Sequence, residues 1–102
     1  MTQRFILPSE TTKIISVNTL KIYKSKLNKL ANNGFNSVDS LIQNQIEVIN
    51  LINNMVNGDE DKHRQEKRLI YSAIFFVLPQ EVLAQQNEYY FAFQKAKQNY
   101  SI

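Results

Sequence analysis

Three residues divide this chain into segments: Gly34, Gly58 and Pro79. Between them, apolar side chains recur at spacings of three and four residues, which places them on one face of a helix. The 102 residues include only two glycines and two prolines, so we expect long regular elements with few turns. No segment alternates apolar and polar residues as a strand does. The sequence therefore predicts an all-α fold.

Local signals predict where the helices begin and end. The first helix should start at Ser16 or Asn18, whose side-chain oxygens can cap it, and stop at Gly34, which can adopt the left-handed conformation. Pro79 should end the fourth helix, which runs over about residues 61–78, and open one last continuous helix. Short links favour a compact orthogonal bundle of roughly four to five helices over a long parallel one.

Between these helices, further caps and one inward face are predicted. Asn36 or Ser37 should cap a short second helix, and Asn44 a third. Asp59 or Asp61 should cap the fourth. In the third helix, helical spacing places four apolar residues on the inward face: Ile46, Ile49, Ile52 and Val56.

The chain is long enough for one domain and too short for two. We expect residues 1–15 to form an extended lead-in and residues 16–102 a single helical domain. In the lead-in, Phe5, Ile6 and Leu7 can dock on the core or on a partner. No cysteine is present, so an intracellular location is expected, and no apolar segment approaches a membrane span, so no membrane partner is expected.

Residues that carry chemistry are few. His63 is the only histidine and has no second ligand one helical turn away, so we expect neither a metal site nor a catalytic role. The acidic run at residues 59–61 resembles part of a calcium loop but lacks its glycine and closing glutamate. No Gly-rich phosphate loop or nucleophile elbow occurs. The sequence predicts no enzyme, no catalytic residue, no cofactor and no small-molecule substrate.

Net charge is +3, and its excess lies in residues 1–57, with six basic side chains against three acidic ones. Four lysines surround the solvated side of the first helix, and of these only Lys21 and Lys24 share one flank, beside Ser25. They can be ordinary solubilising charge or contacts to phosphate. A surplus this small permits nucleic-acid binding without requiring it.

A second basic cluster lies on the fourth predicted helix. Arg64 and Arg68 are one turn apart, and Tyr71 lies one turn beyond Lys67. Glu66 is close enough in sequence to pair with the neighbouring basic side chains, so an ion-paired surface explains the cluster about as well as a phosphate site.

The aromatic run at residues 88–93 holds more rings than one core face needs. If Tyr89 and Phe93 point inward together with Tyr100, then Tyr90 and Phe91 point toward a groove or another chain. Exposed tyrosine and phenylalanine often mark an interface.

An ordered pattern over about residues 16–78 resembles the N-terminal core-binding domain of tyrosine recombinases and phage integrases. The residues that carry the resemblance are Ser16, Thr19, Tyr23, Leu27, Leu30, Val48, Ile52, Arg64, Arg68, Leu69, Ser72, Ala73, Ile74 and Leu78. The resemblance implies a SAM-like bundle that grips one side of DNA, mostly through phosphates. It implies these DNA contacts: Thr19, Lys21, Lys24, Ser25, Arg64, Lys67, Arg68 and Tyr71.

The chain departs from that family because it lacks the catalytic arginine, the His-x-x-Arg box and the nucleophilic tyrosine. Recombination is therefore not expected, and Tyr100 is not interpreted as a nucleophile. As a stand-alone module it resembles short proteins of large DNA viruses, which implies the cytoplasm or nucleus of a host cell, or the virion, as its location.

Two functions stay open at this point. The first is a non-enzymatic DNA-binding module that contacts the duplex backbone through the first and fourth helices. The second is an interaction or structural protein, such as a minor capsid component, that docks on itself or on a larger partner. Its interface residues would be Phe5, Ile6, Tyr90 and Phe91. The DNA hypothesis requires Lys21 and Lys24 to meet the Arg64–Arg68 cluster in space.

Overall fold

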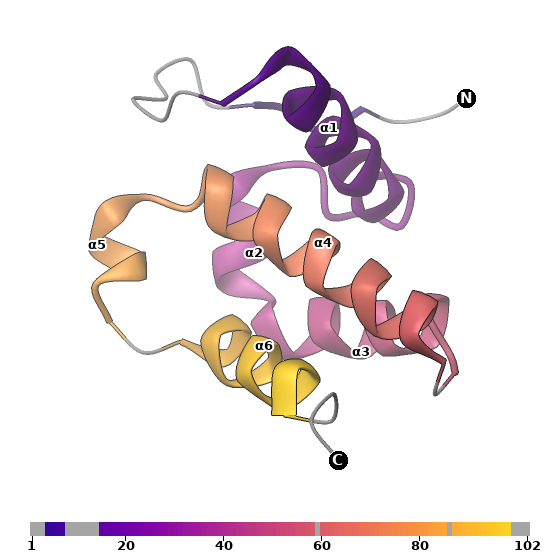
Figure 1. Cartoon of the computed structure of the whole chain (residues 1–102). Coiled ribbons are helices and arrows are strands. Elements are labelled where there is room, and N and C mark those ends of the chain that lie inside the picture. Colours follow the sequence, from indigo (N-terminus) through magenta and orange to yellow (C-terminus); the bar gives the residue numbers. More distant parts are fainter. Residues whose placement is uncertain (1–3, 8–14, 59, 86, 99–102) are drawn as a thin grey trace.

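The computed structural model describes residues 4–7, 15–58, 60–85 and 87–98. All regular structure in these ranges is helical, which confirms the predicted all-α bundle. The described ranges contain six helices: α1 (Val17–Ala31), α2 (Val38–Gln43), α3 (Gln45–Met55), α4 (Asp61–Val77), α5 (Gln80–Leu83) and α6 (Glu88–Gln98). Figure 1 shows α1 at one edge of the molecule, α4 crossing its middle and α6 at the opposite edge.

The ends of α1 follow from local chemistry. The hydroxyl oxygen of Ser16 accepts a hydrogen bond from the backbone N–H of Thr19 at 3.1 Å, which satisfies one of the free amides of the first turn. At the other end Gly34 has a φ of 99°, a conformation that costs a glycine little. The backbone N–H of Phe35 then donates to the carbonyl of Leu30 at 3.1 Å. Both predicted ends of this helix are confirmed.

The caps of the next three helices agree only in part with the prediction. Ser37 caps α2 through reciprocal hydrogen bonds with Ser40. Asn44 stands at the N-cap position just before α3, as predicted, but its side chain donates to the carbonyl of Ser40 at 2.9 Å and makes no capping hydrogen bond. Glu60 precedes α4 without a side-chain cap, and Asp61 lies within the first turn, so a capping role for Asp61 was wrong. Asp59, the other predicted cap, lies outside the described residues.

The predicted last helix is two helices. The side chain of Asn87 explains the break: its Oδ1 accepts from the backbone N–H of Tyr90 at 3.0 Å, as a helix cap does. Its Nδ2 donates to the carbonyls of Val82 and Gln85, both at 3.3 Å, which ties the link back to α5. An asparagine that satisfies backbone groups in this way competes with a continuous helix. The break turns α6 back against α3 and α4.

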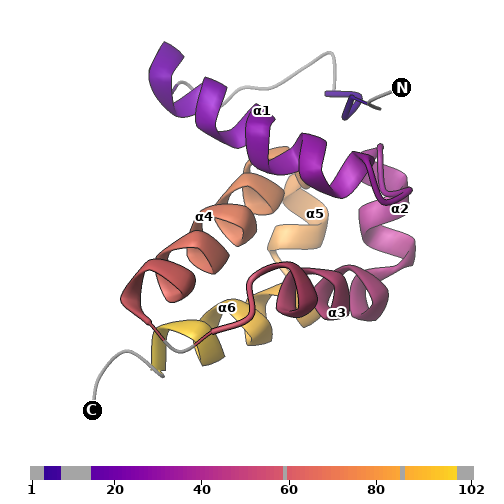
Figure 2. The ribbon, with the colours of Figure 1, turned by 90° about the vertical axis from the view of Figure 1, so that its right-hand side faces the viewer.

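The core forms around α4, which packs against α1 on one side and α6 on the other (Figure 2). The ring of Tyr23 on α1 meets that of Phe76 with centroids 5.5 Å apart. Phe75 and Phe93 make an edge-to-face pair between α4 and α6 at 5.4 Å. Tyr89 of α6 is fully buried and donates its hydroxyl hydrogen to the carbonyl of Leu41 at 2.5 Å. Burial raises the pKa of Tyr89, so the hydroxyl stays a donor.

The described part of the lead-in packs on the bundle. The backbone N–H of Phe5 donates to Oδ1 of Asn28 at 2.9 Å, and that of Ile6 donates to the carbonyl of Asn36 at 2.8 Å. The ring of Phe5 is only 8% exposed and belongs to the core. The prediction of Phe5 as an interface residue was therefore wrong, whereas Ile6 is 63% exposed.

Candidate interaction surfaces

The lysines of α1 that face α4 are not those of the predicted DNA clamp. Lys26 and Lys29 both bind the carboxylate of Glu66, with N–O distances of 2.7 Å and 3.1 Å. Partial burial raises the pKa of Glu66, but the hydrogen bonds and charges of the two lysines outweigh it and hold the pKa below its ordinary value. At the seam between α1 and α4, Glu66 is therefore neutralised by Lys26 and Lys29 of the same chain.

The arginines of α4 point away from this seam. Residues two apart on a helix point about 200° apart, so Arg64 and Arg68 lie on nearly the opposite side of α4 from Glu66. Nη2 of Arg64 binds Asp61 at 2.6 Å, within the same helix. Tyr71 is 2% exposed, and burial raises its pKa to about 12. Its prediction as a DNA contact was wrong, because a ring enclosed in the core cannot reach a phosphate.

The predicted clamp is consequently divided into two parts. Lys21 and Lys24 lie on the flank of α1 that borders the N-terminal segment, since Lys24 lines a hollow there with Asn28. Arg64, Lys67 and Arg68 lie on α4, beyond the Glu66 seam. The two remaining predicted contacts are Thr19, whose hydroxyl accepts from that of Ser16 at 2.8 Å, and Ser25, which is exposed. The structure does not bring the two basic clusters onto one surface.

One basic surface forms beside the N-terminal segment, and we name it the basic flank. It consists of Arg4, Val17, Lys21 and Lys24, all exposed. Val17, Lys21 and Lys24 follow at spacings of four and three, so they share one face of α1. Arg4 lines the same hollow as Lys24. Within the described part of the chain, neither lysine of this flank makes an ion pair.

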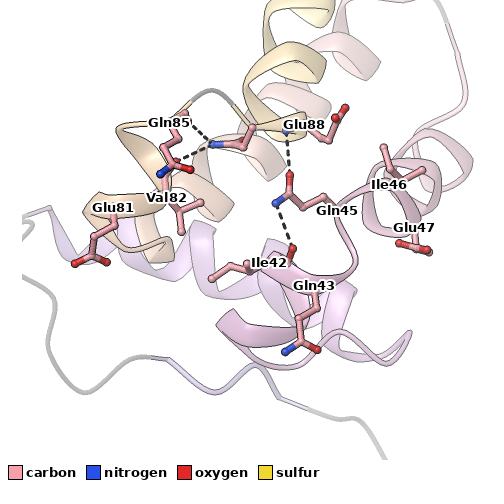
Figure 3. A pocket seen from close by; sticks show the side chains of 10 residues that line it. Ile42, Gln43, Gln45, Ile46, Glu47, Glu81, Val82, Gln85 and Glu88 are labelled. Carbon is pink, nitrogen blue, oxygen red and sulfur yellow. Dashed lines mark hydrogen bonds between the residues drawn. The ribbon is translucent and has the colours of Figure 1, made fainter.

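A second surface is an open groove between the α2–α3 corner and the α5–α6 corner, with a volume of about 690 Å³. Its lining residues, from here on called the groove, are Ile42, Gln43, Gln45, Ile46, Glu47, Glu81, Val82, Gln85, Asn87 and Glu88. They include three carboxylates and three aliphatic side chains and no basic one. Figure 3 shows Glu81, Glu88 and Glu47 on different sides of the hollow, around a central Gln45.

Gln45 holds the two corners of the groove together. Its Nε2 donates to the carbonyl of Ile42 at 3.2 Å, and its Oε1 accepts from the backbone N–H of Glu88 at 3.0 Å (Figure 3). One side chain thus joins the end of α2 to the first turn of α6. The groove is preformed, because its walls are fixed by contacts within the chain.

Exposed apolar side chains lie in and beside the groove. Ile46 was predicted to face inward but is 52% exposed, because it lies two residues before the buried Val48 and so points to the other side of α3. Phe91, 51% exposed, lies one turn beyond Glu88 on α6. Tyr90 is also exposed and its ring meets that of Phe91 at 5.6 Å. Their role in an interface stays a prediction.

Sequence reasoning missed the groove as a whole. Its residues come from two stretches about 40 positions apart, 42–47 and 81–88, and the second stretch was expected to be one straight helix. The one signal in the sequence was Asn87, a good capping residue within the predicted helix.

The described ranges also bear on metal binding and on membrane insertion. No group of three or more metal-binding side chains comes together in them. None of their helices is both long and apolar enough to cross a membrane. His63 packs against Gly58 at the start of α4.

Comparisons with protein-family models, with curated protein sequences and with solved structures find no match to this chain. The resemblance to recombinase core-binding domains therefore stays a prediction.

Proposed function

We propose that this protein is a non-enzymatic interaction module whose groove receives a basic, partly apolar segment of a protein partner. The observation that carries the proposal is the lining of the groove: three carboxylates around exposed aliphatic side chains, with no cation among them. This develops the interaction hypothesis drawn from the sequence, which placed the interface on the N-terminal segment and on the aromatic side chains of the last helix. The proposed site is instead the groove, which lies beside Phe91 of α6.

The carboxylates of the groove favour a positively charged partner. Within the described residues, Glu47, Glu81 and Glu88 make no ion pair, so their field extends into the groove. Carboxylates that line a hollow attract basic segments and speed their association, and they repel phosphates.

The apolar residues provide the affinity that charge does not. Exposed ion pairs contribute about 0–1 kcal/mol each, so carboxylates alone would bind weakly. Burying Ile46 and the neighbouring aliphatic surface contributes about 25 cal/mol for each Å² removed from water. Phe91, one turn beyond the rim, extends the apolar surface. A segment with lysine or arginine beside an aliphatic stripe complements both the carboxylates and the apolar side chains of the groove.

A titration followed by NMR tests this proposal. Two synthetic helical peptides would carry the same leucine stripe, one with lysines and one with glutamates beside it. The lysine peptide should shift the amides of residues 42–47 and 87–88, and the glutamate peptide should not. The Glu81→Lys, Glu88→Lys variant should weaken binding of the lysine peptide about tenfold or more, as expected when two ion pairs become repulsive. Equal binding of the two peptides, or shifts confined to other helices, would refute the proposal.

DNA binding is a second candidate, and the basic flank is the observation that favours it. Three cations, Arg4, Lys21 and Lys24, gather there, which is a narrower contact than the two-helix clamp expected from the sequence. Neutralising three phosphates predicts a slope of about −3 for the logarithm of affinity against the logarithm of salt concentration. A duplex titration at two salt concentrations measures that slope, and Lys21→Gln, Lys24→Gln should reduce it to about −1. Absence of a complex at low salt would remove this candidate.

A further inference from the structure

We propose that the groove of one copy receives the basic flank of a second copy, so that the chain assembles head to tail. The inference rests on the proposed function of the groove and names its occupant. Both surfaces belong to the same chain and complement each other. The groove offers Glu47, Glu81, Glu88 and the exposed Ile46, and the flank offers Arg4, Lys21, Lys24 and Val17, which is 69% exposed.

The contrast among the lysines of α1 supports this pairing. Lys26 and Lys29 are neutralised by Glu66 within the same copy. Lys21 and Lys24 form no ion pair with any described residue. The same holds for the three glutamates of the groove, so each surface keeps the charge that the other lacks.

The flank has the form that a groove can accept. Val17, Lys21 and Lys24 lie along one face of a helix of 15 residues, which presents an aliphatic side chain and two cations in a row. An amphipathic helix laid in a partly apolar groove is a common mode of recognition. Lysine also contributes its aliphatic stem, which can cover Ile46 while its ammonium group reaches a carboxylate.

One copy does not bring its own two surfaces together. In both views of the molecule α1 lies at one edge and α6 at the opposite edge, with α4 between them (Figures 1 and 2). The contact between copies therefore joins two different surfaces. An interface of that kind is not closed by a two-fold axis, so it continues into a ring or an open filament.

The test uses two full-length variants that each block one surface. Glu81→Lys, Glu88→Lys blocks the groove, and Lys21→Gln, Lys24→Gln blocks the flank. All four side chains are exposed, so both variants should keep the far-UV circular dichroism of the parent chain. Size would be measured by sedimentation velocity over a range of protein concentrations at low and high salt, after nuclease treatment.

The parent chain should show a mass that rises with concentration at low salt and falls toward the 11.9 kDa monomer at high salt. Each variant alone should stay a monomer. An equimolar mixture of the two should form a dimer and nothing larger, because only one groove and one flank in the pair still match.

Three results would overturn the inference. They are a parent chain that stays monomeric at low salt, assembly that survives both variants, and a mixture that behaves as the sum of its parts. If the parent is monomeric and the lysine peptide still binds the groove, the proposed function stands and only self-assembly fails. If the peptide also fails to bind, both proposals fall.

Discussion

The seam between α1 and α4 and the groove between the α2–α3 and α5–α6 corners use carboxylates in opposite ways. In the seam, Glu66 pairs with two lysines, so its charge is neutralised within the fold. In the groove, no basic side chain lies among the lining residues. The seam is part of what holds two helices together, whereas the groove leaves its charge available to another molecule.

This difference separates residues that stabilise the fold from residues free to bind. A partly buried charge is stabilised by the opposite charge beside it. Removing that partner leaves the charge uncompensated and lowers the stability of the fold. An exposed carboxylate without a partner contributes little to folding, and its replacement is expected to change stability by less than about 0.5 kcal/mol. Stability measurements on matched variants can therefore test the comparison before any partner is known.

The largest effect is expected where the groove side of the bundle is anchored. Tyr89→Ala removes a fully buried ring and its hydrogen bond to the carbonyl of Leu41, which should lower the free energy of unfolding by about 3–5 kcal/mol. Tyr89→Phe keeps the ring and should cost only about 1 kcal/mol. Urea unfolding followed by circular dichroism measures both. Tyr90→Ala, on the exposed side of the same helix, is the control and should cost about 0.5 kcal/mol; an equal loss at both positions would mean that α6 does not pack as described.

The contribution of Asn87 to the break before α6 should also be measurable, as a change in stability and in hydrogen exchange. Asn87→Ala removes the side chain that caps α6 and binds back to α5, so it should cost about 1 kcal/mol. Hydrogen exchange at the amide of Tyr90 should become faster, because that N–H loses its acceptor. Asn53→Ala, at an exposed position within α3, serves as the control and should be neutral or slightly stabilising, since alanine favours helices. Unchanged exchange at Tyr90 would argue against the cap.

A direct comparison of the two surfaces comes from one substitution in each. Glu66→Gln leaves Lys26, whose side chain is 15% exposed, without its carboxylate, and should cost about 1 kcal/mol. Glu81→Gln in the groove should change stability by less than about 0.5 kcal/mol. Thermal and urea unfolding at neutral pH measure the pair. Equal costs would show that the groove carboxylate is as much a part of the fold as that of the seam.

Much of the fold could be predicted because it depends on local chemistry. Ser16, Gly34 and Pro79 act through their own side chains or backbone angles, and each ended or began a helix near the predicted place. The outcome was different where a residue has two possible roles. Asn87 is a residue type that can cap a helix, but it lies within the predicted last helix. Its capping role depends on the backbone groups that its side chain meets in the fold.

The candidate sites could not be predicted because they depend on the register between helices. Glu66 was expected to pair near its own position on α4, but the packing of Tyr23 against Phe76 brings Lys26, 40 residues away, to its carboxylate. The same packing places Lys21 on the other side of α1. Periodicity indicates which face of a helix is buried and does not indicate which neighbour covers each flank.

The smallest expected effect is the pH dependence of the seam. The pKa of Glu66 is lower in the folded chain than its ordinary value of 4.5, so the ionised form is favoured by folding. Its contribution is fully present above the unfolded-state pKa and is lost as pH falls through the folded-state pKa. The difference in unfolding free energy between the parent chain and Glu66→Gln should therefore be constant from about pH 6 to 8 and shrink below about pH 4.5. Urea unfolding of both chains at closely spaced pH values would show this, and a difference that grew on acidification would mean that Lys26 and Lys29 do not stabilise the carboxylate.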